Sequence, residues 1–149
     1  MRGETAAAAR PDGLARVRSL LADGGRPPIG ETLEFSLVEV GLGRAVFEGV
    51  PGRHAYNPMG TVHGGYAATL LDSACGIATA SRLAHDQGFT TLELKVAYHK
   101  AMTDQTGRVR AEGIVISMGR RVAFVEAKLT DTSGILLASA TSTLLVTSA

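Results

Sequence analysis

Six residues with reactive side chains or exposed backbone groups follow one another at fixed spacing in the middle of the chain. Asp72 is the single formal charge between Gly64 and Ser81, in a stretch otherwise made of small, apolar and hydroxyl residues. A buried carboxylate is costly unless it is paired, so this acid is a candidate base or nucleophile. A structural acid satisfied by Thr69 or Ser73 is the alternative. The six residues are Asn57, Gly60, His63, Gly64, Gly65 and Asp72.

The start of the segment after His63 could bind an oxyanion. The first turn of a helix has backbone N–H groups without intrahelical partners, and the helix dipole adds partial positive charge there. Gly64 and Gly65 let a ligand approach these groups without a Cβ in the way. Asn57, seven residues earlier, could add a side-chain amide donor, although Asn-Pro is also a turn signal that would only shape the loop.

One copy of this helix cannot bring its acid to its own start. Eight residues separate Gly64 from Asp72, a rise of roughly 12 Å along the axis. Two antiparallel copies in a symmetric dimer could do so, each lending its acid to the other and making two equivalent sites. The helix should end between Ala80 and His85. It has no polar stripe, so the rest of the fold should enclose it.

The pattern N-x-x-G-x-x-H-G-G-x-x-x-x-x-x-D resembles that of the hotdog-fold acyl-CoA thioesterases, specifically the phenylacetate-degradation (PaaI) type. The likeness extends from about Ile29 to Val146 and includes the later stretch from Gly119 to Gly134. It implies an α+β fold in which a curved antiparallel sheet wraps around one long helix. It also implies hydrolysis of an acyl-CoA, with an arylacetyl or medium-chain acyl group, to the free acid and coenzyme A, without a cofactor.

The resemblance assigns a catalytic role to Asp72, as general base or as nucleophile, and carbonyl polarisation to Gly64 and Asn57. It gives Thr91 the orientation of the attacking water, with Thr90 beside it, although threonine is common in strands for propensity alone. The remaining expected substrate-binding residues are His63 and Gly65 at the helix start, and Arg120 and Arg121, which could bind coenzyme A phosphates or be plain surface charges.

The other elements follow from periodicity and turn signals. A helix is expected from Gly13 to Ala22, and Arg26 to Gly30 is linker-like. A strand that starts at Thr90 alternates strictly, which is typical of a central strand, and it has no proline that would block pairing with a partner copy. The expected strands are Thr32 to Val40, Arg44 to Val50, Thr90 to His99, Gly107 to Ser117, Arg120 to Thr130 and Ile135 to Val146.

Composition limits the function classes. The chain has 149 residues, 45% of them hydrophobic, which suits a single domain over residues 13–149 after a disordered tail at residues 1–12. A net charge of +1 argues against a nucleic-acid partner, and no tract approaches membrane-spanning length. Cys75 is the single cysteine, so no metal cluster is expected, and a reducing cytoplasm fits.

Two other functions remain open beside hydrolysis. A non-catalytic acyl-CoA binding protein could use the same fold, although about a dozen helical residues before the linker are too few for a helix-turn-helix. A hotdog hydratase or dehydratase would need a paired acid and histidine suited to an enoyl group. The resemblance further implies a homodimer with shared active sites, assembled into a homotetramer.

Overall fold

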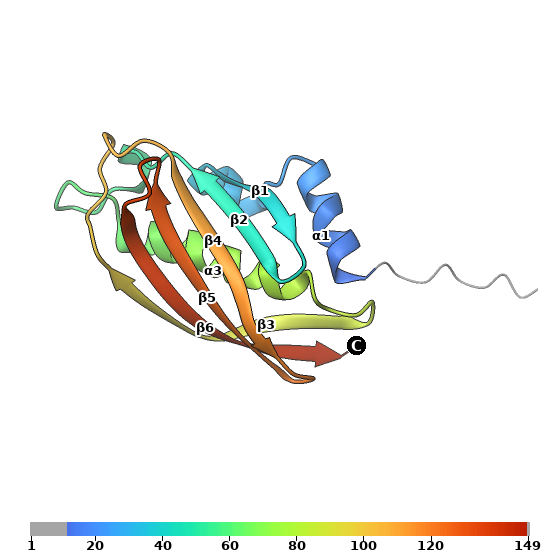
Figure 1. Cartoon of the computed structure of the whole chain (residues 1–149). Coiled ribbons are helices and arrows are strands. Elements are labelled where there is room, and N and C mark those ends of the chain that lie inside the picture. The colour runs from blue at the N-terminus through green and yellow to red at the C-terminus, as the bar shows by residue number, and fades with distance from the viewer. Residues whose placement is uncertain (1–11, 149) are drawn as a thin grey trace, which may run out of the picture.

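The computed structural model describes residues 12–148 and shows one curved sheet wrapped around the long helix α3 (Figure 1). No helix in this described part is long and apolar enough to cross a membrane. The helices are α1 (Gly13–Ala22), α2 (Pro28–Leu33), the short 3-10 helix η1 (Arg53–Ala55) and α3 (Gly64–Ala80). The strands are β1 (Phe35–Gly41), β2 (Arg44–Gly49), β3 (Gln87–Tyr98), β4 (Val109–Met118), β5 (Val122–Asp131) and β6 (Leu136–Ser148).

The sheet has the order β1-β2-β4-β5-β6-β3, and every neighbouring pair is antiparallel. This confirms the expected α+β hotdog architecture. The prediction that the strand after the helix is central is wrong, because within residues 12–148 β3 pairs only with β6 and forms an edge of the sheet (Figure 1). Alternation along a strand reports which face is buried, and it does not report how many neighbours the strand has.

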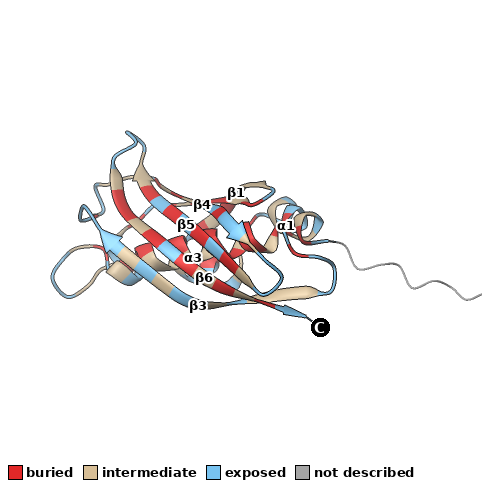
Figure 2. Ribbon diagram, turned by 60° about the horizontal axis from the view of Figure 1, so that its bottom comes forward, coloured by how far each residue is buried: buried red, intermediate tan, exposed pale blue. Residues whose placement is uncertain are grey.

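The core lies between α3 and the concave face of the sheet (Figure 2). The small residues of α3 allow the backbones to approach closely, as the sequence predicts. A Cβ at Gly113 on β4 would lie 2.5 Å from the carbonyl oxygen of Ala74, so only glycine fits there. A Cβ at Gly76 would lie 3.0 Å from the ring of Phe89 on β3. Strands β4 and β3 therefore both pack closely against α3.

The amino-terminal half departs from the expected elements in one place. The helix expected from Gly13 to Ala22 is confirmed, and Asp12 caps it by accepting from the N–H of Ala15 at 2.9 Å. Residues 1–11 of the expected tail lie outside the described residues. The expected linker and the strand start at Thr32 are wrong, because α2 occupies residues 28–33. Pro28 suits the first position of a helix, and Glu34, with φ of 60°, ends it.

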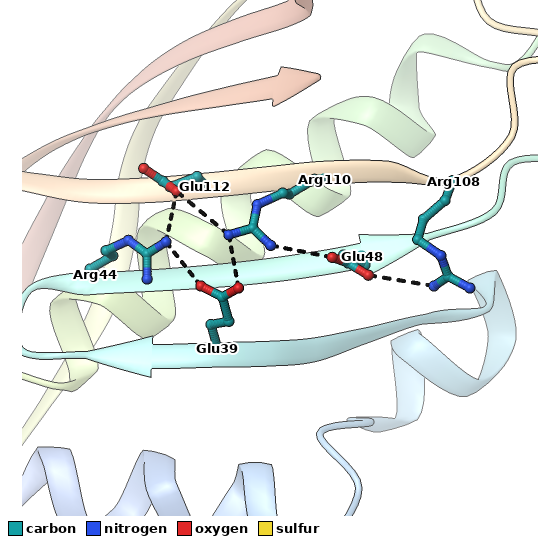
Figure 3. A network of polar contacts seen from close by, with 6 residues as sticks. All are labelled: Glu39, Arg44, Glu48, Arg108, Arg110 and Glu112. Carbon is teal, nitrogen blue, oxygen red and sulfur yellow. Dashed lines mark hydrogen bonds and ion pairs between the residues drawn. The ribbon is translucent and has the colours of Figure 1, made fainter. Parts of the chain in front are cut away.

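The convex face of β1, β2 and β4 has a network of ion pairs (Figure 3). Arg44 reaches both Glu39 and Glu112, at 3.0 and 2.9 Å, and Arg110 reaches Glu39 at 2.9 Å. These two guanidinium groups lower the pKa of Glu39 below its ordinary value. The network also includes Glu48 and Arg108. The side chains are partly exposed, so its contribution to stability is modest and sensitive to salt.

Candidate active site

Asp72 lies half-buried in the middle of α3, and the edge strand provides its hydrogen-bond partner. The hydroxyl of Thr91 on β3 donates to Oδ1 of Asp72 at 3.0 Å. The hydroxyl of Thr69, one of the groups expected to satisfy a purely structural acid, donates instead to the carbonyl of Gly65 at 2.7 Å. Within residues 12–148 no cation pairs with Asp72, so its carboxylate keeps acceptor capacity for a substrate, a water or a proton.

The start of α3 is organised around one unpaired donor. The N–H of Gly65 donates to Nδ1 of His63 at 2.8 Å, and the N–H of Tyr66 donates to the carbonyl of His63 at 3.0 Å. Among the residues that the structure describes, the N–H of Gly64 has no acceptor. His63 thus caps the helix, and the N–H of Gly65 is not free for a ligand because it donates to the His63 ring. Of the glycine pair, only Gly64 has a backbone N–H without an acceptor within the described residues, so it is the candidate for the predicted oxyanion donor.

Asn57 shapes the loop that leads to this helix start. Its Oδ1 accepts from the N–H groups of Met59 and Thr61, at 2.9 and 3.2 Å, and its Nδ2 donates to Oγ1 of Thr61 at 2.9 Å. The side-chain carbonyl of Asn57 therefore shapes the loop, as the alternative to a catalytic role predicts. An amide nitrogen has two hydrogens, so Asn57 retains one donor for a ligand.

Sequence reasoning missed Tyr98, which lies against the helix start. Its hydroxyl, at the end of β3, donates to the carbonyl of Gly64 at 2.7 Å. The alternation of β3 placed Tyr98 on the same face as Leu94 and Val96, which pack against the core. That pattern could have indicated that the phenol points toward α3. No local motif marks the contact, since it joins residues 34 positions apart.

Three of the expected site residues lie elsewhere. Thr90 is exposed, because it points to the opposite face of β3 from Thr91. Arg120 and Arg121 are exposed in the turn between β4 and β5. The carbonyl of Arg121 accepts from the N–H of Val146, which pairs with Phe89, so the turn lies at the Phe89 end of β3. The structure does not bring these arginines to the helix start.

Burial affects the titration of two groups near the site. It raises the pKa of the Cys75 thiol to about 12, with a smaller contribution from the charge of Asp72. It also raises the pKa of Tyr66 to about 12. Both groups stay protonated at neutral pH, so neither competes with Asp72 as a base or nucleophile. Within the described residues no group of three histidine, cysteine or acidic side chains is placed to hold a metal ion.

The structure therefore has an acid, Asp72, that accepts a hydrogen bond from Thr91, and an unpaired backbone N–H at Gly64, eight residues away on the same helix. The family model of the thioesterase superfamily matches residues 59–138, which include both. The chain belongs to the thioesterase superfamily. It is a thioester hydrolase, in agreement with the resemblance found in the sequence.

Relatives of this thioesterase share both sequence and fold. The 1,4-dihydroxy-2-naphthoyl-CoA hydrolase of Listeria monocytogenes is 32% identical over 107 residues, which cover 72% of this chain and 85% of the relative. A thioesterase family protein from Silicibacter pomeroyi superposes with a TM-score of 0.80 at 25% identity, covering 92% of this chain and 99% of the other. A conserved protein from Pseudomonas aeruginosa superposes with a TM-score of 0.76 at 30% identity, covering 84% and 98%.

Proposed function

We propose that this thioesterase hydrolyses an acyl-CoA to the free acid and coenzyme A in a site shared between two copies of the chain. The observation that carries the proposal is that α3 has an unpaired N–H at its first residue, Gly64, and a single acid, Asp72. The hydroxyl of Thr91 orients this acid. An N–H at a helix start is suited to the oxyanion of a tetrahedral intermediate. The coenzyme A thioester named for the Listeria relative supports the substrate class.

The proposed reaction places the thioester carbonyl oxygen against the N–H of Gly64 and the remaining amide hydrogen of Asn57. As a general base, Asp72 of the other copy takes a proton from water while the water oxygen bonds to the carbonyl carbon. The tetrahedral oxyanion then collapses, the carbon–sulfur bond breaks, and the thiolate takes the proton back from the carboxyl group. The products are the acid and the free thiol.

A nucleophilic route uses the same groups. An oxygen of Asp72 bonds to the carbonyl carbon, the thiolate leaves, and a mixed anhydride forms. Water then opens the anhydride, which releases the acid and restores the carboxylate, and the remaining proton of the water goes to the thiolate. Thr91 serves either route, because its hydrogen bond occupies Oδ1 of Asp72 and leaves the other carboxylate oxygen free to take a proton or to attack the carbonyl carbon.

The sharing of the site rests on the position of β3. A rise of roughly 12 Å separates Gly64 from Asp72 along α3, so one chain does not bring both to a single carbonyl. The edge strand β3 has one unpaired row of backbone groups that a second copy could continue as an antiparallel pair. Two-fold symmetry would then set the two α3 helices antiparallel. We further propose that pairs of these dimers form the tetramer of the phenylacetate-degradation type.

We propose that the acyl group is an arylacetyl or medium-chain group bound toward the carboxyl end of α3. Asp72, Gly76 and Ala80 lie on one stripe of the helix, four residues apart, and the last two have little or no side chain. The ring of Phe89 packs against Gly76, and a cavity of about 260 Å³ lies at the carboxyl end of α3. Its apolar lining includes Val17, Leu20, Ala80, Leu83 and Phe89.

The nucleotide of coenzyme A is proposed to lie on the surface, with Arg120 or Arg121 near its phosphates. Both side chains are exposed, and guanidinium groups bind phosphate through paired charge-assisted hydrogen bonds. We place the enzyme in a reducing compartment such as the cytoplasm, because a buried free thiol at Cys75 is compatible with one.

The test is an incubation of the protein with a panel of acyl-CoAs and a thiol-reactive dye. Hydrolysis of arylacetyl or medium-chain substrates releases one thiol for each acid formed. A protein that binds acyl-CoA without releasing a thiol would be a non-catalytic binder. Loss of enoyl absorbance without thiol release would indicate a hydratase. Either result would refute the proposed function.

A further inference from the structure

We infer that Tyr98 is a positioning residue that fixes the Gly64 N–H for the oxyanion. This inference rests on the proposed function, because it assigns a task to Tyr98 in the same site. It starts from one contact, the hydrogen bond of 2.7 Å from the Tyr98 hydroxyl to the carbonyl of Gly64. The contact joins the last residue of an edge strand to the first residue of the core helix.

The fit between the two residues is close. A Cβ at Gly64 would lie 2.9 Å from the hydroxyl oxygen of Tyr98 and 3.0 to 3.2 Å from the nearest ring carbons. The phenol therefore occupies the space that a side chain at position 64 would need. Glycine at this position serves the packing of Tyr98 as well as the access of a ligand.

Two hydrogen bonds hold the Gly64–Gly65 peptide group, which directly follows the unpaired donor. Nδ1 of His63 accepts from the N–H of Gly65, and Tyr98 donates to the carbonyl of Gly64. Glycine is the residue with the greatest backbone freedom, and a first helical turn lacks the bonds that order later turns. The two contacts restrain both ends of the Gly64–Gly65 peptide group. The preceding peptide group, which carries the Gly64 N–H, is held by the hydrogen bond of 3.0 Å from the N–H of Tyr66 to the carbonyl of His63. With the peptide groups on both sides of the Gly64 Cα restrained, the N–H of Gly64 keeps its direction while it remains free for a ligand.

We expect this hydrogen bond to contribute little to the stability of the single chain. Tyr98 is 57% exposed, although its hydroxyl reaches the helix. An exposed hydrogen bond exchanges readily with water and contributes little to folding. The helix is held independently by buried contacts, such as the one between Gly113 and Ala74. A function in positioning explains a precise contact from an exposed side chain better than a function in the core does.

The experiment compares Tyr98→Phe with Tyr66→Phe. Tyr66 lies in the first turn of the same helix, but its buried hydroxyl has no hydrogen-bond partner within the described residues. We expect Tyr98→Phe to lower kcat about tenfold with KM within about twofold, because a misdirected oxyanion donor weakens the transition state. We expect Tyr66→Phe to keep wild-type kcat. The thermal midpoint of Tyr98→Phe should stay at the wild-type value.

A second readout does not depend on activity. The amide hydrogen of Gly64 should show an altered NMR shift in Tyr98→Phe and not in Tyr66→Phe, because the adjacent carbonyl loses its donor. Gly64→Ala should displace the phenol, so the double variant Gly64→Ala/Tyr98→Phe should be no slower than Gly64→Ala. An unchanged kcat in Tyr98→Phe, or losses that multiply in the double variant, would overturn the inference. A wild-type protein without any thioesterase turnover would instead refute the proposed function.

Discussion

The hydroxyl of Thr91 lies 3.0 Å from Oδ1 of Asp72 and donates a hydrogen bond to it. The edge strand thereby sets the rotation of the only acid in the core helix. A hydroxyl that bonds one carboxylate oxygen selects which oxygen faces the substrate. It also supplies a hydrogen-bond partner to a half-buried carboxylate that has no cation beside it within residues 12–148.

Removing this hydroxyl should slow the reaction while sparing the fold. We expect Thr91→Val to lower kcat about tenfold, because a hydrogen bond to a charged group contributes on the order of 1.5 kcal/mol. Thr91→Ser keeps the donor and should stay within about threefold of the wild type. Steady-state kinetics on the best acyl-CoA would measure both. Equal rates for the valine and serine variants would contradict the assigned function of Thr91.

Asp72→Ala should lower turnover by at least about 100-fold, the lower range for loss of an acid–base group. Its stability should be unchanged or improved, since a half-buried charge is costly to desolvate. Circular dichroism and a denaturant titration would establish that the variant folds. If folded Asp72→Ala retains more than about a tenth of wild-type activity, the catalytic assignment is wrong.

Asn57→Ala separates the two functions of that side chain. Loss of one oxyanion donor should reduce kcat by roughly 100-fold. The matched control is Thr61→Ala, which removes the hydroxyl that accepts from Nδ2 of Asn57 but leaves its amide in place. That control should lose much less activity. Similar losses in the two variants would show that Asn57 only shapes the loop.

Mixing two inactive variants tests whether the site is shared. One is Asp72→Ala, and the other is Gly64→Pro, which lacks the oxyanion N–H at a helix position that tolerates proline. A mixed dimer collects both defects in one site and leaves the other intact, so random exchange should restore about a quarter of normal activity. Both variants must be folded, and exchange must be shown with tagged subunits. Absence of rescue under those conditions would mean that each chain builds its own site.

Cys75 should be invisible to thiol reagents in the native protein. Its pKa of about 12 keeps the thiol protonated, and burial blocks access. Native protein at about pH 8 should give no colour with a disulfide reagent, and denatured protein should give one thiol per chain. The unfolded thiol ionises first, so stability should fall as pH rises from about 9 toward 12. Rapid native labelling would contradict this burial.

The sequence predicted the parts of the fold that depend on local pattern. The limits of α1 match the prediction, and α3 begins at the glycine pair and ends where expected. The edge position of β3 could not be predicted, because strand order depends on contacts between distant residues. The short helix α2 was not predicted, because Pro27 and Pro28 are typical of a linker. Proline is also favoured at the start of a helix, and Pro28 is the first residue of α2.

The sequence identifies candidate site residues but not their arrangement, and their roles stay predictions. The spacing in the sequence predicts that Gly64 and Asp72 lie on one helix and too far apart to reach the same carbonyl. In the structure both residues lie on α3, eight residues apart. The spacing could not show that His63 uses the N–H of Gly65 and thereby leaves Gly64 as the single donor. Nor could it show the bond from Tyr98, because a contact across 34 residues depends on how β3 crosses the helix.

The edge position of β3 makes the site more fragile than the domain that contains it. In the described part of the chain the strand is hydrogen-bonded on one side only, to β6 (Figure 1). Local opening of such a strand requires less free energy than unfolding of the whole domain. The same opening would separate Thr91 from Asp72 and Tyr98 from Gly64 together. On heating an isolated chain, the site geometry should therefore be lost several degrees before the core around α3 melts, and a partner strand on this edge would bring the two transitions together.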